Sequence, residues 1–181
     1  MPRFGFGFVL CFGLVASALA QNAAKPVDHP AWTALAQLTG EWVGDGDGAP
    51  GQGSGAFRFT SELQGRVYVR KNFAEYPAAA GRAAFRHDDL LVVYRPEDGG
   101  APRATYWDNE GHVIEYTVSV SEDRKTIVFV SAAADKQPRF RFTYEFTGKS
   151  AMKIRFEIAP PGAPEKFQRY IEAGAKKKVA E

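Results

Sequence analysis

The chain of 181 residues is long enough for one domain with a substantial hydrophobic core. Its 23 basic and 21 acidic side chains nearly balance, which argues against a dedicated nucleic-acid-binding protein. The single cysteine, Cys11, excludes an intramolecular disulfide, so we expect the domain to be stabilised by burial of apolar side chains alone.

The first twenty residues have the pattern of a secretory signal peptide. Arg3 precedes an apolar run from Phe4 to Leu19, and an A-x-A cleavage site ends at Ala20. The run is too short to be preferred as a membrane span. Cys11 lies inside it behind a leucine, a context that disfavours lipidation, so we expect no stable membrane anchor after cleavage.

A linker and a short helix are expected between the cleavage site and the first strand. Asp28 can cap a helix whose first turn holds Pro30. Its apolar stripe at helical spacing consists of Trp32, Leu35 and Leu38. We therefore divide the chain into a signal peptide (1–20), a linker (21–31) and one domain (32–179), with a secreted or periplasmic location.

The segment from Leu38 to Gly46 predicts the first strand. Leu38 and Trp42 share one side of a period-2 pattern with glycines, where a bulky side chain would block close approach of backbone. A tryptophan at this place can plug one end of a closed sheet. The glycine-rich residues 45–54 lead straight back into a strand pattern, so we interpret them as a flexible loop rather than a phosphate-binding loop.

Most of the remaining chain alternates apolar and polar residues with the period of half-buried strands. Residues 77–89 break this pattern, and we interpret them as a solvated loop. The segment from Glu165 to Ala175 fits either a helix or a strand. The other predicted strands cover 57–63, 66–73, 90–94, 104–107, 112–120, 126–130, 140–146 and 152–158.

Three segments together resemble the calycin superfamily of lipocalin-like, fatty-acid-binding-like and nitrobindin-type barrels, in the form of a secreted bacterial family of unknown function. They are the Gly-x-Trp at 40–42, the hairpin at 106–112 and the final segment at 170–178. The resemblance covers roughly residues 32 to 179. It implies an all-β fold, a single antiparallel calycin-like barrel of about ten strands with a short N-terminal helix. Since a barrel must join its edges, we predict that 165–175 is the closing strand.

A barrel of this size encloses a lumen that is either filled by side chains or open to a small ligand. We predict non-catalytic binding of a small apolar or amphipathic molecule in the lumen. The alternatives are an envelope-associated protein-interaction module with a filled barrel, and a lumen-based isomerase or hydrolase that uses His112. The oligomeric state stays open. The predicted ligand-binding residues are Trp42, Arg66, Tyr68, Arg70, Trp107, His112, Tyr116 and Tyr170.

One predicted strand carries basic residues on a single face. Arg66, Tyr68 and Arg70 could bind a carboxylate inside the barrel, as arginines do in fatty-acid-binding-like relatives, because the guanidinium fork donates two parallel hydrogen bonds. Unpaired charge inside a protein is costly, however. We therefore favour an outward, hydrated orientation for this face.

Catalysis finds little support in the sequence. Neither Gly-x-Ser-x-Gly nor His-Glu-x-x-His occurs, and the histidines lie in or beside predicted turns. His112 follows Trp107, Asp108 and Glu110 and would be a carboxylate-oriented base if this hairpin curled into the barrel mouth. An exposed surface turn is the favoured interpretation, because hairpin tips usually point outward.

Metal and heme sites are not predicted. His87 precedes two aspartates, but neighbours in an extended loop rarely converge on one ion. Nitrobindin-like relatives hold heme through a histidine near the end of the barrel, whereas no histidine follows His112 here. Tyr170 could ligate heme iron as tyrosinate, yet we interpret it as a buried tyrosine. We therefore expect no cofactor.

Overall fold

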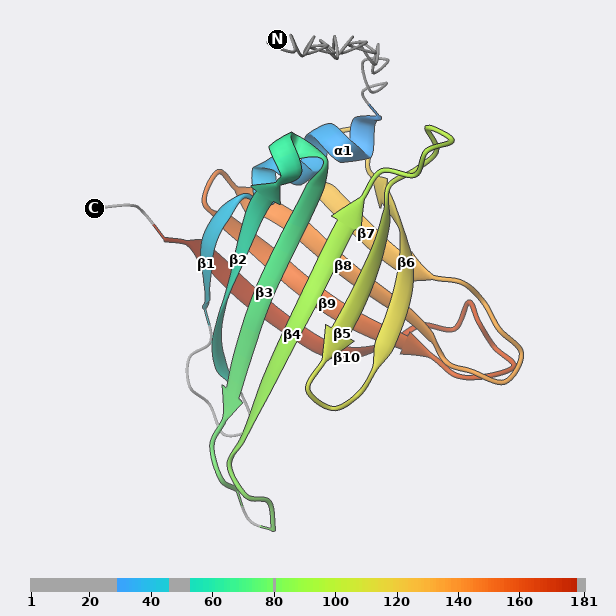
Figure 1. The fold of residues 1–181 in the computed structure, drawn as a ribbon. Helices are drawn as coiled ribbons and strands as arrows, with labels where there is room; N and C mark the ends of the chain where they lie inside the picture. The colour runs from blue at the N-terminus through green and yellow to red at the C-terminus, as the bar shows by residue number, and fades with distance from the viewer. Residues whose placement is uncertain (1–28, 46–52, 80, 179–181) are drawn as a thin grey trace, which may run out of the picture.

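The computed structural model describes residues 29–45, 53–79 and 81–178, and within them the chain forms a closed antiparallel β-barrel (Figure 1). A short helix, α1 (Pro30–Leu35), and a 3-10 turn, η1 (Ala36–Leu38), precede the barrel. A second 3-10 turn, η2 (Leu63–Gly65), follows β2. The strands are β1 (Gly40–Gly44), β2 (Ser54–Glu62), β3 (Val67–Tyr76), β4 (Phe85–Tyr94), β5 (Arg103–Asp108), β6 (Val113–Val120), β7 (Thr126–Ser131), β8 (Arg139–Gly148), β9 (Ala151–Ala159) and β10 (Gln168–Lys177).

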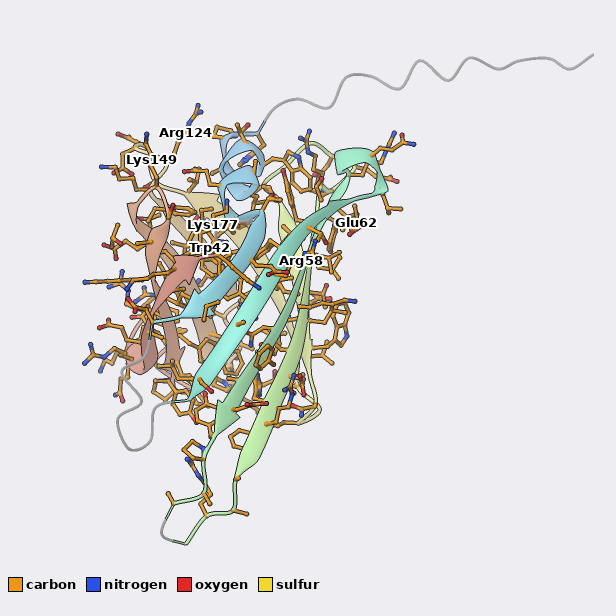
Figure 2. All side chains as sticks on the ribbon, turned by 90° about the vertical axis from the view of Figure 1, so that its left-hand side faces the viewer. Trp42, Arg58, Glu62, Arg124, Lys149 and Lys177 are labelled. Atoms are coloured by element: carbon orange, nitrogen blue, oxygen red, sulfur yellow. The ribbon has the colours of Figure 1, made fainter. Side chains whose placement is uncertain are left out.

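The predicted all-β barrel of about ten strands with an N-terminal helix is confirmed. Each strand pairs with its neighbours in sequence, and β1 pairs with β10 to close the sheet. The ambiguous segment near residue 170 is therefore the closing strand. Trp42 is the register partner of Lys177, whose ammonium nitrogen lies 5.4 Å from the centre of the indole ring. Figure 2 shows these two side chains together at the seam.

Helix α1 begins at Pro30, two residues before the predicted start of the domain. Its N-cap is His29, whose Nδ1 accepts a hydrogen bond from the backbone amide of Ala31 at 3.2 Å. Asp28, the predicted cap, lies outside the described residues, as do the predicted signal peptide and most of the loop after Gly44. Within the described residues, no helix is long and apolar enough to cross a membrane.

The barrel is filled at the end that α1 covers. Trp42 is fully buried there, and its indole N–H donates a 2.8 Å hydrogen bond to the carbonyl of Leu38. The indole stacks on Phe57 with ring centroids 6.2 Å apart. Trp42 thus fills the end of the sheet, as its position among glycines indicated. Other buried side chains of this packed half are Trp32, Leu35, Phe59, Tyr68, Val93, Tyr116, Val118, Ile127, Phe129 and Tyr144.

The opposite end of the barrel is not packed in this way, and we call it the open half. Cross-strand partners share a face of the sheet, so the register identifies the inward side chains. Several inward side chains of this half keep part of their surface accessible, which means that solvent reaches the inner wall. They are Asn72, His87, Tyr106, Ile114, Phe140, Phe142, Phe156, Ile158 and Ala173.

The predicted loop at 77–89 is too long. Strand β4 begins at Phe85, and its first five residues pair with β3, including His87 with Ala74 and Asp89 with Asn72. The alternation of a half-buried strand was missed because the inward positions His87 and Asp89 are polar. At the open end of a barrel, polar side chains on the inner face hide the period on which strand prediction depends.

Candidate functional site

A polar inner wall lies on strands β3, β4 and β5 in the open half of the barrel. Asn72, Asp89 and Asp108 stand on one row of the sheet, because Asp89 is the register partner of both other residues. Pleating turns all three side chains to the same, inner face. The side chain of Asp108 is 4% exposed and that of Asp89 also 4% exposed.

Arg70 and Asp89 form a buried ion pair in this wall. One guanidinium nitrogen of Arg70 donates to Asp89, and the other donates to the hydroxyl of Tyr144 at 2.7 Å. Asn72 donates to the second oxygen of Asp89 at 2.7 Å. Burial would lower the pKa of Arg70 and raise that of Asp89. The pair overrides both effects, holding the pKa of Arg70 above and that of Asp89 below its usual value.

The favoured outward orientation of the 66–70 face is wrong for two of its three residues. Tyr68 and Arg70 point into the barrel and are 7% and 5% exposed, whereas Arg66 is exposed beside η2. Arg70 tolerates the interior because Asp89, from the adjacent strand, compensates its charge. The carboxylate that Arg70 binds thus comes from the chain itself.

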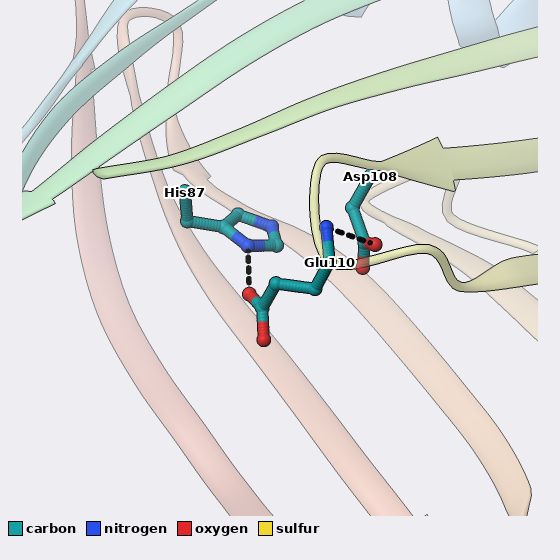
Figure 3. Close-up of side chains that lie close together, drawn as sticks. All are labelled: His87, Asp108 and Glu110. Atoms are coloured by element: carbon teal, nitrogen blue, oxygen red, sulfur yellow. Dashed lines mark hydrogen bonds and ion pairs between the residues drawn. The ribbon is translucent and has the colours of Figure 1, made fainter. Parts of the chain in front are cut away.

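His87 lies between two carboxylates at the edge of the same wall. Its Nδ1 is 2.7 Å from Glu110 (Figure 3). Its Nε2 is 3.1 Å from the hydroxyl of Tyr106 and 3.4 Å from Asp89. Asp89 first and Glu110 second overcome the effect of burial and raise the pKa of His87 to about 9. At neutral pH both ring nitrogens of His87 therefore carry a proton, unless another cation replaces one of these protons.

Asp108 ends β5 and organises the turn to β6. One of its oxygens accepts backbone N–H groups of Glu110 at 3.0 Å and His112 at 2.9 Å, and the other lies 2.8 Å from Nδ1 of His112. Tyr106 donates to the latter oxygen at 3.2 Å. Burial opposes ionisation of Asp108, but these hydrogen bonds, led by those of His112, lower its pKa.

The wall opposite is apolar and belongs to β8, β9 and β10. Phe142 and Phe156 are cross-strand partners, and their ring centroids are 6.2 Å apart. Phe142 also faces Arg70, whose guanidinium carbon is 5.0 Å from the ring centre, so the two walls meet there. Phe140, Ile158 and Ile171 extend the apolar surface toward the mouth. The open half therefore offers polar contacts on one side and apolar contacts on the other.

The eight residues predicted to bind ligand fall in different places. Tyr170 is 70% exposed and packs its ring on inward Phe156, which places it at the mouth and not in the core. His112 occupies the exposed turn that the sequence favoured. The predicted residues buried in the packed half are Trp42, Tyr68 and Tyr116. The polar wall contains only Arg70 of the predicted set, and the outer surface holds Arg66 and Trp107.

Sequence reasoning did not bring several residues of the polar wall together, although it weighed His87 with its neighbouring aspartates as a metal site and named Asp108 and Glu110 beside His112. A signal was present at two of them, since His87 and Asp89 are in phase with inward Leu91 and Val93 of the same strand. The remaining positions gave no such signal, because their proximity depends on the register between β4 and β5. The missed residues are Asn72, His87, Asp89, Tyr106, Asp108 and Glu110.

A groove of about 390 Å³ lies on the outer face of β1 to β4. Its charged side chains are largely paired with one another. Arg58, labelled in Figure 2, lies 3.6 Å from Glu41, and Arg86 lies 3.0 Å from Asp88. The lining still carries more cations than carboxylates, since Arg58, Lys71, Arg86 and Lys178 stand against Glu41 and Asp88. The groove does not combine buried polar side chains with an apolar wall, as the open half of the barrel does, so we place the candidate site in the open half.

Comparison with known proteins bears on the fold. No protein-family model matches the chain, and no curated protein matches it. The crystal structure of Rv2717c from M. tuberculosis is similar, with a TM-score of 0.54 and 16% sequence identity. The match covers 83% of this chain and 99% of that chain. At this identity the likeness concerns the barrel fold alone.

Proposed function

We propose that the protein is secreted or periplasmic and binds a small apolar or amphipathic molecule in the open half of its barrel, without catalysing a reaction. The observation that carries the proposal is the partly exposed inner wall, divided into a polar side on β3 to β5 and an apolar side on β8 to β10. Ligand sites are typically apolar concave surfaces with a few convergent polar groups.

The charges of the polar wall limit the head group of such a ligand. Two cations, Arg70 and His87, face three carboxylates, so one negative charge is in excess. Arg70 is already neutralised by Asp89, which removes the attraction that a fatty-acid carboxylate would need. We therefore expect neutral or cationic head groups, such as an alcohol, an amide or an amine, to bind better than carboxylates.

The protonation of the wall argues for binding rather than catalysis. A general base must be unprotonated at working pH, whereas His87 has a pKa of about 9. Burial, first of all, also raises the pKa of Tyr106, which therefore is no activated nucleophile. His112, the base of the alternative enzymatic hypothesis, lies in an exposed turn with its Nδ1 on Asp108.

Native mass spectrometry of the purified protein tests the proposal. We expect a stoichiometric adduct after incubation with a long-chain alcohol or amine, and loss of the adduct on denaturation. Ala173→Trp places an indole on the inner face of the open half, because Ala173 is the register partner of inward Ile154. It should abolish the adduct. Thr117→Trp, which adds the same ring on the exposed outer face of β6, is the matched control.

The outcomes separate the candidates. A bare mass with every lipophile, or an adduct that survives Ala173→Trp, would refute binding in the open half. The mass of the exported protein tests the location independently, because cleavage after Ala20 gives a chain that begins at Gln21.

A further inference from the structure

Three side chains at the mouth of the barrel place possible metal-donor atoms close to one another. His87 contributes a ring nitrogen, and Asp108 and Glu110 contribute one carboxylate oxygen each. These three atoms lie within 4.8 Å of one another (Figure 3). They come from two segments of the chain, the beginning of β4 and the β5–β6 turn, so the group exists only because the strands pair in this register.

The turn that carries Glu110 is fastened to β4. Asn109 accepts a hydrogen bond from the amide of Asp88 at 3.1 Å and donates from its side chain to the carbonyl of Arg86 at 3.0 Å. Its own amide donates to the carbonyl of Asp88 at 3.0 Å. Because these bonds flank His87 on its strand, they hold Glu110 beside the imidazole. The donor set is thus positioned by backbone contacts before any ion arrives.

The ring of His87 is oriented from its other side as well. While Nδ1 faces Glu110, Nε2 faces the hydroxyl of Tyr106 at 3.1 Å and the buried carboxylate of Asp89 at 3.4 Å. Histidines that bind metal ions usually donate their second ring N–H to such an outer carboxylate, which fixes the ring and strengthens the ligand. The contact with Asp89 is independent of the three donor atoms, whereas Tyr106 also donates to Asp108.

We propose that His87, Asp108 and Glu110 bind one divalent transition-metal ion at the mouth of the barrel. One imidazole nitrogen and two carboxylate oxygens suit Zn²⁺, Co²⁺ or Mn²⁺, whereas Ca²⁺ and Mg²⁺ prefer oxygen donors alone. Glu110 is 47% exposed and His87 20% exposed, so the ion can enter from solvent. Three protein ligands leave at least one coordination position for water or for another molecule.

Isothermal titration of untagged, chelator-treated protein with Zn²⁺ tests this site. We expect one ion per chain, and Co²⁺ should give a visible absorption band that Zn²⁺ abolishes. His87→Ala, Asp108→Asn and Glu110→Gln should each weaken Zn²⁺ binding by at least about tenfold, and Asn109→Ala, which frees the turn, by about tenfold. Glu110→Gln changes an exposed turn residue, so its fold is expected to be intact by circular dichroism.

Two control variants make the assignment specific. Asp88→Asn removes the same charge from the outer face of β4 and should leave the affinity within about twofold, since Asp88 pairs with Arg86 outside the barrel. His112→Ala removes the other histidine near Asp108 and should also leave Zn²⁺ bound.

Several results would overturn the proposal. They are the absence of Zn²⁺ binding by the native protein, unchanged binding in Glu110→Gln and His87→Ala, loss of binding in His112→Ala alone, and equal competition by Ca²⁺. The inference does not rest on ligand binding in the barrel. Ala173→Trp should keep the metal ion while it excludes a lipophilic molecule, so the failure of one proposal is distinguishable from the failure of the other.

Discussion

The buried pair of Arg70 and Asp89 should couple the polar wall to the stability of the fold. Arg70→Met keeps much of the volume but leaves the carboxylate of Asp89 buried with Asn72 and His87 as remaining partners. Breaking a buried pair by removing one partner typically costs 3–5 kcal/mol, and we expect about 3 kcal/mol here because His87 compensates in part. For a domain of this size that loss lowers the melting temperature by about 6–12 °C.

The double variant Arg70→Met/Asp89→Leu isolates the interaction. Replacing both charges by apolar side chains is often nearly neutral, so the double variant should lose about 2 kcal/mol at most, less than either single change. The coupling energy between the two positions should then exceed about 2 kcal/mol. Urea unfolding followed by the fluorescence of the buried Trp32 and Trp42 provides the free energies.

The free energy of unfolding at acidic pH provides a second measurement on the same variants. The pKa of Asp89 is held below its usual value of 3.8, so its contribution is present above that pH and is lost as the pH falls. In Arg70→Met the carboxyl group of Asp89 can take up a proton. The difference in free energy of unfolding between the native protein and this variant should therefore decrease below about pH 4. A loss under about 1 kcal/mol in Arg70→Met, or a double variant as unstable as the sum of the single ones, would refute this reasoning.

Three further changes test other parts of the structure by the same unfolding assay. In metal-free protein, the stabilisation by His87 is fully present below pH 6.5 and is lost as the pH rises through about 9. His87→Gln should therefore lower the free energy of unfolding by on the order of 1 kcal/mol at pH 6, allowing for solvent screening, and by little at pH 10. Equal losses at both pH values would contradict this. Trp42→Phe leaves the carbonyl of Leu38 without its N–H donor and should cost about 1–3 kcal/mol. Gly55→Ala would drive a Cβ into the backbone of β3 and should cost about 1–3 kcal/mol, whereas Gly148→Ala meets no neighbour within 4 Å and should stay within about 0.5 kcal/mol.

The barrel could be predicted because most strands bury one face and expose the other. Phe140, Phe142 and Tyr144 alternate with charged or polar residues, and the structure turns all three inward. The closing strand was predicted on other grounds, namely the resemblance to calycin barrels and the unpaired edge that β1 would otherwise have. Burial on one side is a local property, so the sequence alone shows it.

The polar wall could not be predicted because it is not a local property. His87 and Glu110 meet only through the register of two hairpins, and no spacing along the chain records that register. Burial of Arg70 was judged too costly because its partner, Asp89, lies on the adjacent strand and cannot be identified from the sequence of the strand that carries Arg70. Inward charges depend on compensation across strands, which a single strand pattern does not contain.

Closure of the sheet by its first and last strands has a consequence for how the protein is made. Trp42 and Lys177 belong to the first and last strands of the barrel, so no ribosome-bound intermediate can complete the seam before β10 has left the exit tunnel. Until then β1 and the latest strand present unpaired backbone, and pairing of such distant segments is intrinsically slow. During synthesis both edge strands can therefore pair with strands of other chains. A chain that stops before Gln168 should aggregate instead of folding into a smaller barrel.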